Sequence, residues 1–327
     1  MIAIQIGREP RSIDPLQLHG FRIAGQDVVL DVALPELASF AAAIPADFRM
    51  PVATERDAGA GHRGSEVFRG PSWLAGSDRE VVCRITPAGY ELAVAGIGDF
   101  FVARSGMHVL RTSGNLEPSE PAIAETVLGP ALILALALQG TFCLHASAVS
   151  SPAGAVVFLG PSGAGKSTLA AYLGNETADF TPLADDITPF MVAASGPEAY
   201  PHFPQLKLPT DHQPARNASA RSPLLAAYVL DLPAPGAAED ASNERLDPVH
   251  GIATLMRHTV AIRLFGRSLT ECYLSRMGAA WSGRVRRLRF PRRFEVLPAV
   301  AAAIAAELAG GHPSLQRPEP VPRIQVR

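Results

Sequence analysis

The sequence predicts an α/β fold with a mixed sheet, preceded by a β-rich N-terminal domain. Three observations support this prediction. Short apolar segments separated by glycine, proline and polar turns fill residues 1–120. An apolar segment at 155–159 leads directly into a glycine-rich loop that opens a helix. Strand-like and helix-like segments then alternate through the last third of the chain, which is typical of α/β proteins.

Composition narrows the class of protein. The chain has 327 residues, of which 47% are hydrophobic and 18% charged, and this balance is typical of a globular protein with a sizeable core. The formal net charge of −2 gives no overall field that would hold nucleic acid. The most apolar segment, 130–138, is shorter than the roughly 20 residues of a membrane span, so we expect a buried helix and no membrane partner.

The expected location is the cytoplasm. No basic, then apolar, secretory signal follows Met1. The three cysteines are far apart and form no CxxC pair, which favours buried thiols in a reducing compartment. They are Cys83, Cys143 and Cys272.

Residues 1–120 form the predicted N-terminal domain, to which we assign substrate recognition. Residues 21–32 carry two strand-like pieces around a Gly-Gln-Asp turn, and the polar, glycine-rich stretch 56–64 is predicted as a loop. No histidine here has the spacing of a metal ligand. Further strands are expected at 81–85, 90–94, 100–104 and 107–111.

Residues 121–310 form the predicted second domain, after a linker at 115–121. A helix is expected at 123–139, ended by Gly140. A strand at 141–149, a turn at 150–154 and a strand at 155–159 follow. Because the connecting turn is so short, these two strands should be antiparallel neighbours.

The remaining elements alternate. A strand is expected at 224–232, a loop at 233–243, helices at 248–263 and 298–308, and a loose tail at 311–327. The arginine-rich run 284–293 is predicted as a strand with arginines on its solvent face, and an anion or acidic-peptide site is the alternative.

The glycine-rich loop fits the pattern G-x-x-x-x-G-K-[ST] between a strand and a helix. Its backbone N–H groups and the positive end of the helix should surround phosphate oxygens. Lys166 should reach the β- and γ-phosphates of ATP, and Ser167 should ligate Mg²⁺. A tight glycine turn that binds nothing is the alternative. The predicted nucleotide-binding residues are Gly160, Pro161, Ser162, Gly163, Ala164, Gly165, Lys166, Ser167 and Thr168.

Two acidic residues and a histidine complete the candidate site. Asp185 and Asp186 end an apolar segment, and Asp185 follows Lys166 by only 19 residues, which leaves room for one helix and a return strand. Adjacent carboxylates suit Mg²⁺ and a proton acceptor, and a solvated pair at a strand end is the alternative. His145 lies on the strand before the turn and is expected to face the phosphates, unless it is an ordinary core histidine.

Together these residues resemble the HPr kinase/phosphorylase family, which joins a strand bearing histidine, a turn, a strand, the loop, one helix and an Asp-Asp pair. The resemblance is clear over residues 140–190 and holds in outline over 120–310. Phosphoenolpyruvate carboxykinases share the loop arrangement more distantly. The matching residues are His145, Gly160, Ser162, Gly163, Gly165, Lys166, Ser167, Asp185 and Asp186.

The resemblance implies an ATP- and Mg²⁺-dependent serine kinase of a peptide or protein. It implies that Asp185 is the catalytic base, that Asp186 and Ser167 contact Mg²⁺, and that His145 lies near the transferred phosphate. The family's second signature, an acidic-Val-Arg-Gly-Leu stretch, is replaced here by Tyr200–Pro209. The pattern is more similar to shorter divergent relatives, among them the lasso-peptide kinases, which phosphorylate a serine of a precursor peptide.

Lysine usage singles out one more residue. Of 29 Lys and Arg residues only Lys166 and Lys207 are lysines, so a lysine is expected where a compact point charge is needed. Lys207 is therefore predicted to contact the transferred phosphate or the acceptor, with an exposed loop lysine as the alternative.

Three other functions remain open from the sequence. The first is a nucleotide hydrolase or switch without a phosphate acceptor, and the second is a carboxykinase-like enzyme that acts on a small acid. The third is a nucleotide-responsive binding module without turnover. The sequence also leaves open whether the chain forms a homo-oligomer.

Overall fold

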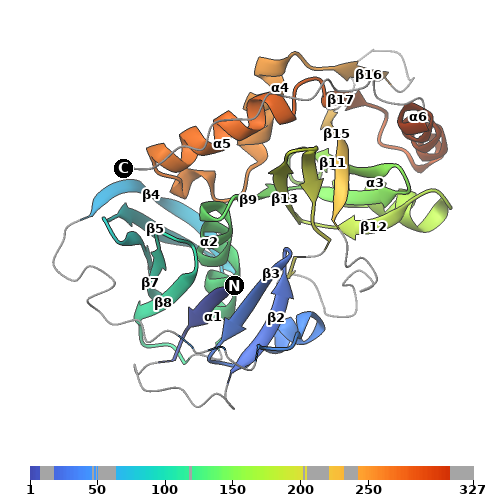
Figure 1. Cartoon of the computed structure of the whole chain (residues 1–327). Helices are drawn as coiled ribbons and strands as arrows, with labels where there is room; N and C mark the ends of the chain where they lie inside the picture. The colour runs from blue at the N-terminus through green and yellow to red at the C-terminus, as the bar shows by residue number, and fades with distance from the viewer. Residues whose placement is uncertain are drawn as a thin grey trace.

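The computed structural model describes residues 1–7, 18–45, 48, 50, 64–117, 120–201, 203–204, 221–231 and 242–309. The fold is mixed α/β, as predicted, and its described residues form two mixed sheets (Figure 1). Lys207 and residues 311–327 lie outside the described residues, as does most of the predicted loop 233–243.

The N-terminal sheet has eight strands in the order β2-β3-β1-β8-β7-β6-β5-β4. Strand β1 pairs in parallel with β3 and β8, whereas the other pairs are antiparallel. The hairpin at 21–32 and the four strands expected between 81 and 111 are confirmed, whereas β1 and β4 were not predicted. The bounds are β1 Ile2–Gln5, β2 His19–Ile23, β3 Gln26–Leu30, β4 Ser65–Leu74, β5 Ser77–Ile85, β6 Gly89–Val94, β7 Gly98–Ala103 and β8 His108–Ser113, with a 3-10 helix η2 at Pro35–Phe40.

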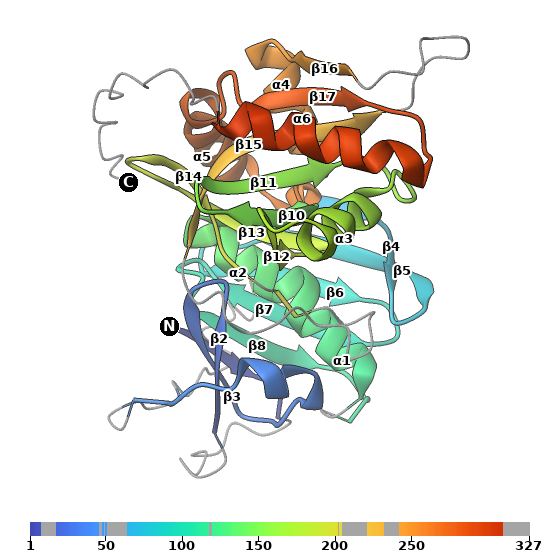
Figure 2. The ribbon, with the colours of Figure 1, turned by 90° about the vertical axis from the view of Figure 1, so that its right-hand side faces the viewer.

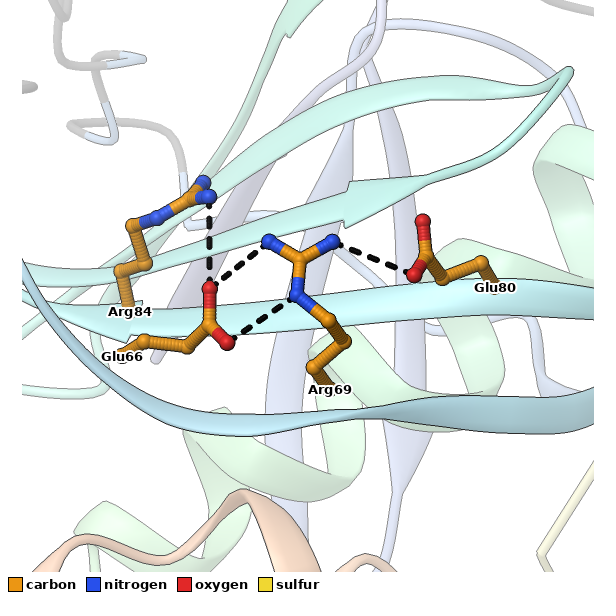
Figure 3. Close-up of polar contacts among 4 residues, drawn as sticks. All are labelled: Glu66, Arg69, Glu80 and Arg84. Carbon is orange, nitrogen blue, oxygen red and sulfur yellow. Dashed lines mark hydrogen bonds and ion pairs between the residues drawn. The ribbon is translucent and has the colours of Figure 1, made fainter.

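Strand β4 lies at one end of this sheet, and charged side chains gather there on one face (Figure 3). Arg69 contacts Glu66 at 2.8 Å and Glu80 at 3.1 Å, and Arg84 lies 3.5 Å from Glu66. Exposed ion pairs of this kind contribute little stability. Charged residues on an edge strand instead discourage pairing with another chain.

One kinked helix lies between the two sheets (Figure 2). It consists of α1 Pro121–Thr126, a π-helical turn η3 Val127–Ala131 and α2 Leu132–Leu138. The prediction of an unbroken helix was wrong at η3, where Gly129 has non-helical angles (φ −84°, ψ −109°) and Pro130 supplies no backbone N–H. The predicted end before Gly140 is confirmed, since Gly140 has a φ of 87°.

The kinked helix is apolar and largely buried. Pro121–Leu138 has 18 residues and a mean hydropathy of 1.9, so by length and composition it is able to cross a membrane. Of this stretch, 67% is buried inside the protein, and α2 contacts β9 on one side and β7 and β8 on the other. Burial against both sheets accounts for its apolar composition.

The second sheet is built around three parallel strands, β11, β15 and β17. Antiparallel strands extend it on both sides, and the first residues of β15 also pair with β14, which leads to β13 and β9. Strand β15 therefore belongs to both branches of the sheet. The bounds are β9 Thr141–His145, β10 Ser147–Ser151, β11 Gly154–Leu159, β12 Thr181–Ala184, β13 Ile187–Ala193, β14 Gly196–Ala199, β15 Ser222–Asp231, β16 Ser242–Arg245 and β17 Val285–Arg289.

The single strand predicted at 141–149 is two strands. Strand β9 pairs with β13, whereas β10 pairs with β11 and β12, and Ala146 joins them. The predicted antiparallel pairing of the strand before the turn with the strand after it is confirmed for β10 and β11. The change of partner at Ala146 brings β9 and β10 to different branches of the sheet.

Helices cover both faces of the second sheet. Val156 and Phe158 of β11 pack in one core with α3 and α6, whereas the alternate residues Val157 and Leu159 pack in the core that includes α4 and α5. The predicted helix at 248–263 ends at His258, and α5 was not predicted. The bounds are α3 Lys166–Glu176, α4 Pro248–His258, α5 Arg267–Ala280 and α6 Leu297–Ala309, with 3-10 helices η5 Ile262–Leu264 and η6 Phe294–Val296.

Val285–Arg289 of the arginine-rich run form strand β17, as predicted, but the arginines do not all face solvent: Arg284 is buried, and the side chain of Arg286 is only 14% exposed. Arg287 and Arg289 lie 3.7 Å from Asp231 and also contact Glu244, and Arg286 pairs with Glu307. The partners of these three arginines are therefore carboxylates of this chain.

Candidate functional site

The glycine-rich loop joins β11 to α3, as the motif requires. Gly163 and Gly165 adopt left-handed φ angles of 74° and 89°, which strongly favour glycine. A Cβ at either position would meet no atom within 4 Å, so the space above the loop is open. A Cβ on Gly160, by contrast, would lie 2.9 Å from the Cβ of Ala164. The loop thus presents backbone rather than side chains toward this open space.

Lys166 begins α3 and lies against the loop. Its Nζ donates hydrogen bonds to the carbonyl oxygens of Gly160 (3.0 Å) and Pro161 (3.2 Å). Burial lowers the pKa of this amine, whereas the nearby carboxylates of Asp186 and Asp185 raise it. A buried cation at a helix N-terminus favours the binding of a phosphate chain, whereas the two carboxylates repel phosphate unless a cation lies between them.

Three side-chain oxygens meet beside the helix N-terminus. Ser167 Oγ donates a 2.8 Å hydrogen bond to Oδ1 of Asp185, and Ser147 Oγ donates a 2.5 Å hydrogen bond to the same oxygen. The two hydroxyl oxygens lie 3.4 Å apart. Ser147 is fully buried and was not identified from the sequence, whereas Ser167 is exposed.

The acidic pair lies in a tight turn between β12 and β13. Asp186 has a φ of 60°, an angle that is uncommon for residues other than glycine but more frequent for Asp. The amide of Ile187 donates to the carbonyl of Asp185 (2.7 Å), and the amide of Ala146 donates to the carbonyl of Asp186 (3.1 Å). The turn is therefore held against the junction of β9 and β10. Residues such as Asp186, in sparsely populated backbone conformations, cluster at functional sites.

At the junction of β9 and β10, the two carboxylates of the acidic pair contact different residues. His145, the last residue of β9, places Nδ1 3.6 Å from Oδ1 of Asp186. Ser147, the first residue of β10, contacts Asp185 instead. The side chains of His145 and Asp186 are 45% and 42% exposed, so both are accessible to a substrate.

His258 is a second residue that the sequence did not indicate. An isolated bridge between Leu144 and Thr259 brings the end of α4 to β9. Burial first, and then the charges of Lys166, His145 and Arg257, lower the pKa of His258 to about 4. No sequence motif surrounds His258, and only the tertiary contact between α4 and β9 identifies it.

The predicted site residues lie close together in the structure, except Lys207, which lies outside the described residues. The structure brings His145, Ser167, Asp185, Asp186 and the loop together, but it pairs Ser167 with Asp185, not with Asp186. Pro161, Ser162 and Thr168 are exposed on the loop and the first turn of α3.

The donor set fits Mg²⁺ bound together with phosphate. Among the described residues no cluster of three His, Cys, Asp or Glu side chains is able to hold a metal by itself. Mg²⁺, however, is usually bound by one or two carboxylates, waters and the phosphates of its nucleotide. Asp185 and the hydroxyl of Ser167, beside an open glycine loop, provide hard oxygen ligands of this kind.

Comparisons with known proteins give little further information. No family model matches the sequence, and no curated protein matches it. One solved structure found by the comparison is the HPr(Ser) kinase/phosphatase from Coxiella burnetii. The match has a TM-score of 0.29 and 11% sequence identity, and it covers 51% of this chain and 97% of that chain. We therefore base the functional assignment on the residues of the site.

Proposed function

We propose that this protein is a Mg²⁺-dependent kinase that transfers the γ-phosphoryl group of ATP to a serine hydroxyl of a peptide or protein. The observation that carries the proposal is the 2.8 Å hydrogen bond between Ser167, at the end of the loop motif, and Asp185. It joins a sequence pattern for phosphate binding to a carboxylate suited to the accompanying metal ion.

We assign the binding of ATP and of Mg²⁺ to different residues of the site. The loop amides and Lys166 hold the phosphates, and Ser167 and Asp185 hold Mg²⁺. The metal ion supplies neutralisation of the phosphate charge. This assignment exchanges the roles that the family resemblance implied for the two aspartates, because Ser167 contacts Asp185 whereas Asp186 lies beside His145.

Asp186 is then the base for the acceptor. The serine oxygen attacks the γ-phosphorus, the bond from the γ-phosphorus to the bridging oxygen breaks, and ADP leaves. The serine proton passes to the carboxylate of Asp186. His145, 3.6 Å from that carboxylate, is placed to orient it.

The test is transfer of label. The purified protein, Mg²⁺ and γ-labelled ATP are incubated with cell extract, with Lys166→Ala as the inactive control. Label on serine of a peptide or protein supports the proposal. Hydrolysis of ATP without labelled product would identify a hydrolase or switch, binding without turnover would identify a binding module, and turnover of a small acid would identify a carboxykinase-like enzyme.

A further inference from the structure

A cavity of about 260 Å³ opens next to the candidate site, between the N-terminal sheet and the second sheet. Asp186 lies in its wall, so the cavity and the site share a residue. Strands β4, β5 and β13, the kinked helix, and residues 203–204 and 260–264 supply the other walls. Its main apolar residues are Phe68, Leu74, Leu128, Ile133, Ile187 and Leu264.

We propose that this cavity receives a bulky apolar side chain, such as Leu, Met or Phe, that lies next to the acceptor serine in the substrate peptide. The inference rests on the proposed function and adds a substrate class to it. With the apolar side chain in the cavity, the neighbouring serine is held beside Asp186.

The chemistry of the walls favours an apolar occupant. Two charged residues besides Asp186 line the cavity, and both have partners in the protein. Glu125 accepts a 2.9 Å hydrogen bond from the amide of Ala75. Arg263 donates to Ser72 Oγ at 3.3 Å and lies 4.8 Å above the ring of Phe68. The rest of the lining is mostly apolar, so an apolar side chain gains most by entering.

The size of the cavity favours one side chain of a longer chain over a complete small molecule. Sites for whole small ligands usually measure roughly 300–1,000 Å³, and this cavity is smaller. Trp73 lines the cavity and is 59% exposed, so it lies at the mouth, where the rest of a peptide would pass. Exposed tryptophan is enriched among residues that dominate protein interfaces.

The kinked helix contributes to this space. Gly129 and Pro130 of η3 line the cavity, and a Cβ on Gly129 would meet no atom within 4 Å. In a regular helix a side chain would occupy this position. In η3 the position is held by Gly129, so space remains beside Leu128 and Ile133. The break in the helix and the cavity therefore occur at the same place.

The first experiment is a peptide library with one fixed serine, in which one flanking position at a time is varied, assayed with γ-labelled ATP and Mg²⁺. Pools with Leu, Met or Phe at one flanking position should be labelled about ten- to a hundredfold more than pools with Gly, since burial of such a side chain adds that much affinity. Equal labelling of all pools, or binding of ATP with no labelled pool, would overturn the inference.

The second experiment uses the best peptide and two pairs of variants. Trp73→Ala at the mouth and Val260→Phe in the wall should each lower kcat/KM for the peptide at least about fivefold, mainly through KM. Phe294→Ala also truncates an exposed aromatic residue, and Val249→Phe also enlarges a valine. These residues are 73% and 76% exposed and do not line the cavity, so both variants should keep kcat/KM. Unchanged kcat/KM in both cavity variants would contradict the inference.

Nucleotide binding distinguishes a failure of the proposed function from a failure of the cavity assignment. Each variant is also titrated with ATP in the presence of Mg²⁺. Parent-like ATP affinity shows that the variant is folded and that its glycine-rich loop is intact. A wild-type protein that binds no nucleotide would contradict the proposed function itself. A protein that binds ATP and labels peptides, but without preference for apolar neighbours, would contradict only the assignment of the cavity.

Discussion

Ser147 of β10 donates a 2.5 Å hydrogen bond to Oδ1 of Asp185, 38 residues later in the chain. The same oxygen accepts a 2.8 Å hydrogen bond from Ser167, so one carboxylate oxygen connects β10, the turn after β12 and the first turn of α3. The carboxylate is therefore oriented by the fold before a ligand binds. Orientation in advance lowers the ordering cost of binding.

Lys166→Ala should abolish phosphoryl transfer without unfolding the protein. Its Nζ is the cation held against the loop carbonyls, and its removal leaves the phosphates without that charge. Lys166→Arg should also lose most activity, because a planar guanidinium does not replace a point charge there. Transfer assays and melting temperatures check this, and substantial activity in Lys166→Arg would argue against a catalytic loop.

The two aspartates should give different defects. Asp186→Asn should lower kcat at least about a hundredfold with ATP binding kept, since the base for the acceptor is lost. Asp185→Asn should instead raise the Mg²⁺ concentration needed for half-maximal rate. A Mg²⁺ titration of both variants decides between them. The reverse pattern would restore the roles implied by the family resemblance, and full activity in both would remove the kinase proposal.

Ser147→Ala should weaken Mg²⁺ binding without removing catalysis. Ser147 acts by orienting Asp185, so the half-saturating Mg²⁺ concentration should rise about three- to tenfold while kcat at saturating Mg²⁺ stays near the parent value. The matched control is Ser150→Ala on the same strand, whose hydroxyl contacts Thr181 at 2.8 Å. Identical Mg²⁺ curves for both variants would show that Ser147 has no positioning role.

His258 should make the protein less stable in mild acid. Burial holds its pKa at about 4 in the folded chain, against 6.5 when unfolded. Between these values the unfolded chain binds a proton that the folded chain does not, so stability falls as the pH drops from about 6.5 to 4. His258→Gln should therefore lose less melting temperature between pH 7 and pH 5 than the parent. Equal slopes in the parent and in His258→Gln would contradict the prediction.

Lys207 remains a prediction from lysine usage alone. If it contacts the transferred phosphate, Lys207→Ala and Lys207→Arg should lower turnover at least about tenfold, which corresponds to roughly 1.4 kcal/mol of barrier. Turnover and ATP affinity are measured for both variants. Parent-like turnover in both would identify an ordinary surface lysine.

The glycine-rich loop of the site was predictable because all of its residues lie in one short stretch of sequence. The loop is specified by its glycines and Lys166, and their positions relative to β11 and α3 follow from the motif. Ser147 and His258 were not predictable, because their contacts depend on strand register and on where α4 packs. The pairing of Asp185 with Ser167 has the same origin, since two adjacent carboxylates look alike in the sequence.

The same distinction explains the fold. Alternating strands of the N-terminal sheet were predictable from turns and periodicity. The division of 141–149 at Ala146 was not, because β9 and β10 are mostly buried and no glycine or proline marks the break between them. The interruption at Gly129–Pro130 could have been predicted, because proline breaks helices. It was not predicted, because the residues around it form a continuous apolar helix-like segment.

The buried position of Pro121–Leu138 has a consequence for folding. Side chains from both sheets and from this helix belong to one continuous apolar core, so neither sheet can complete its core when the helix is displaced. Thermal unfolding should therefore be a single cooperative transition in which both sheets unfold together. A chain divided before Pro121 would leave the N-terminal fragment with an uncovered apolar face, and that fragment should aggregate when produced alone.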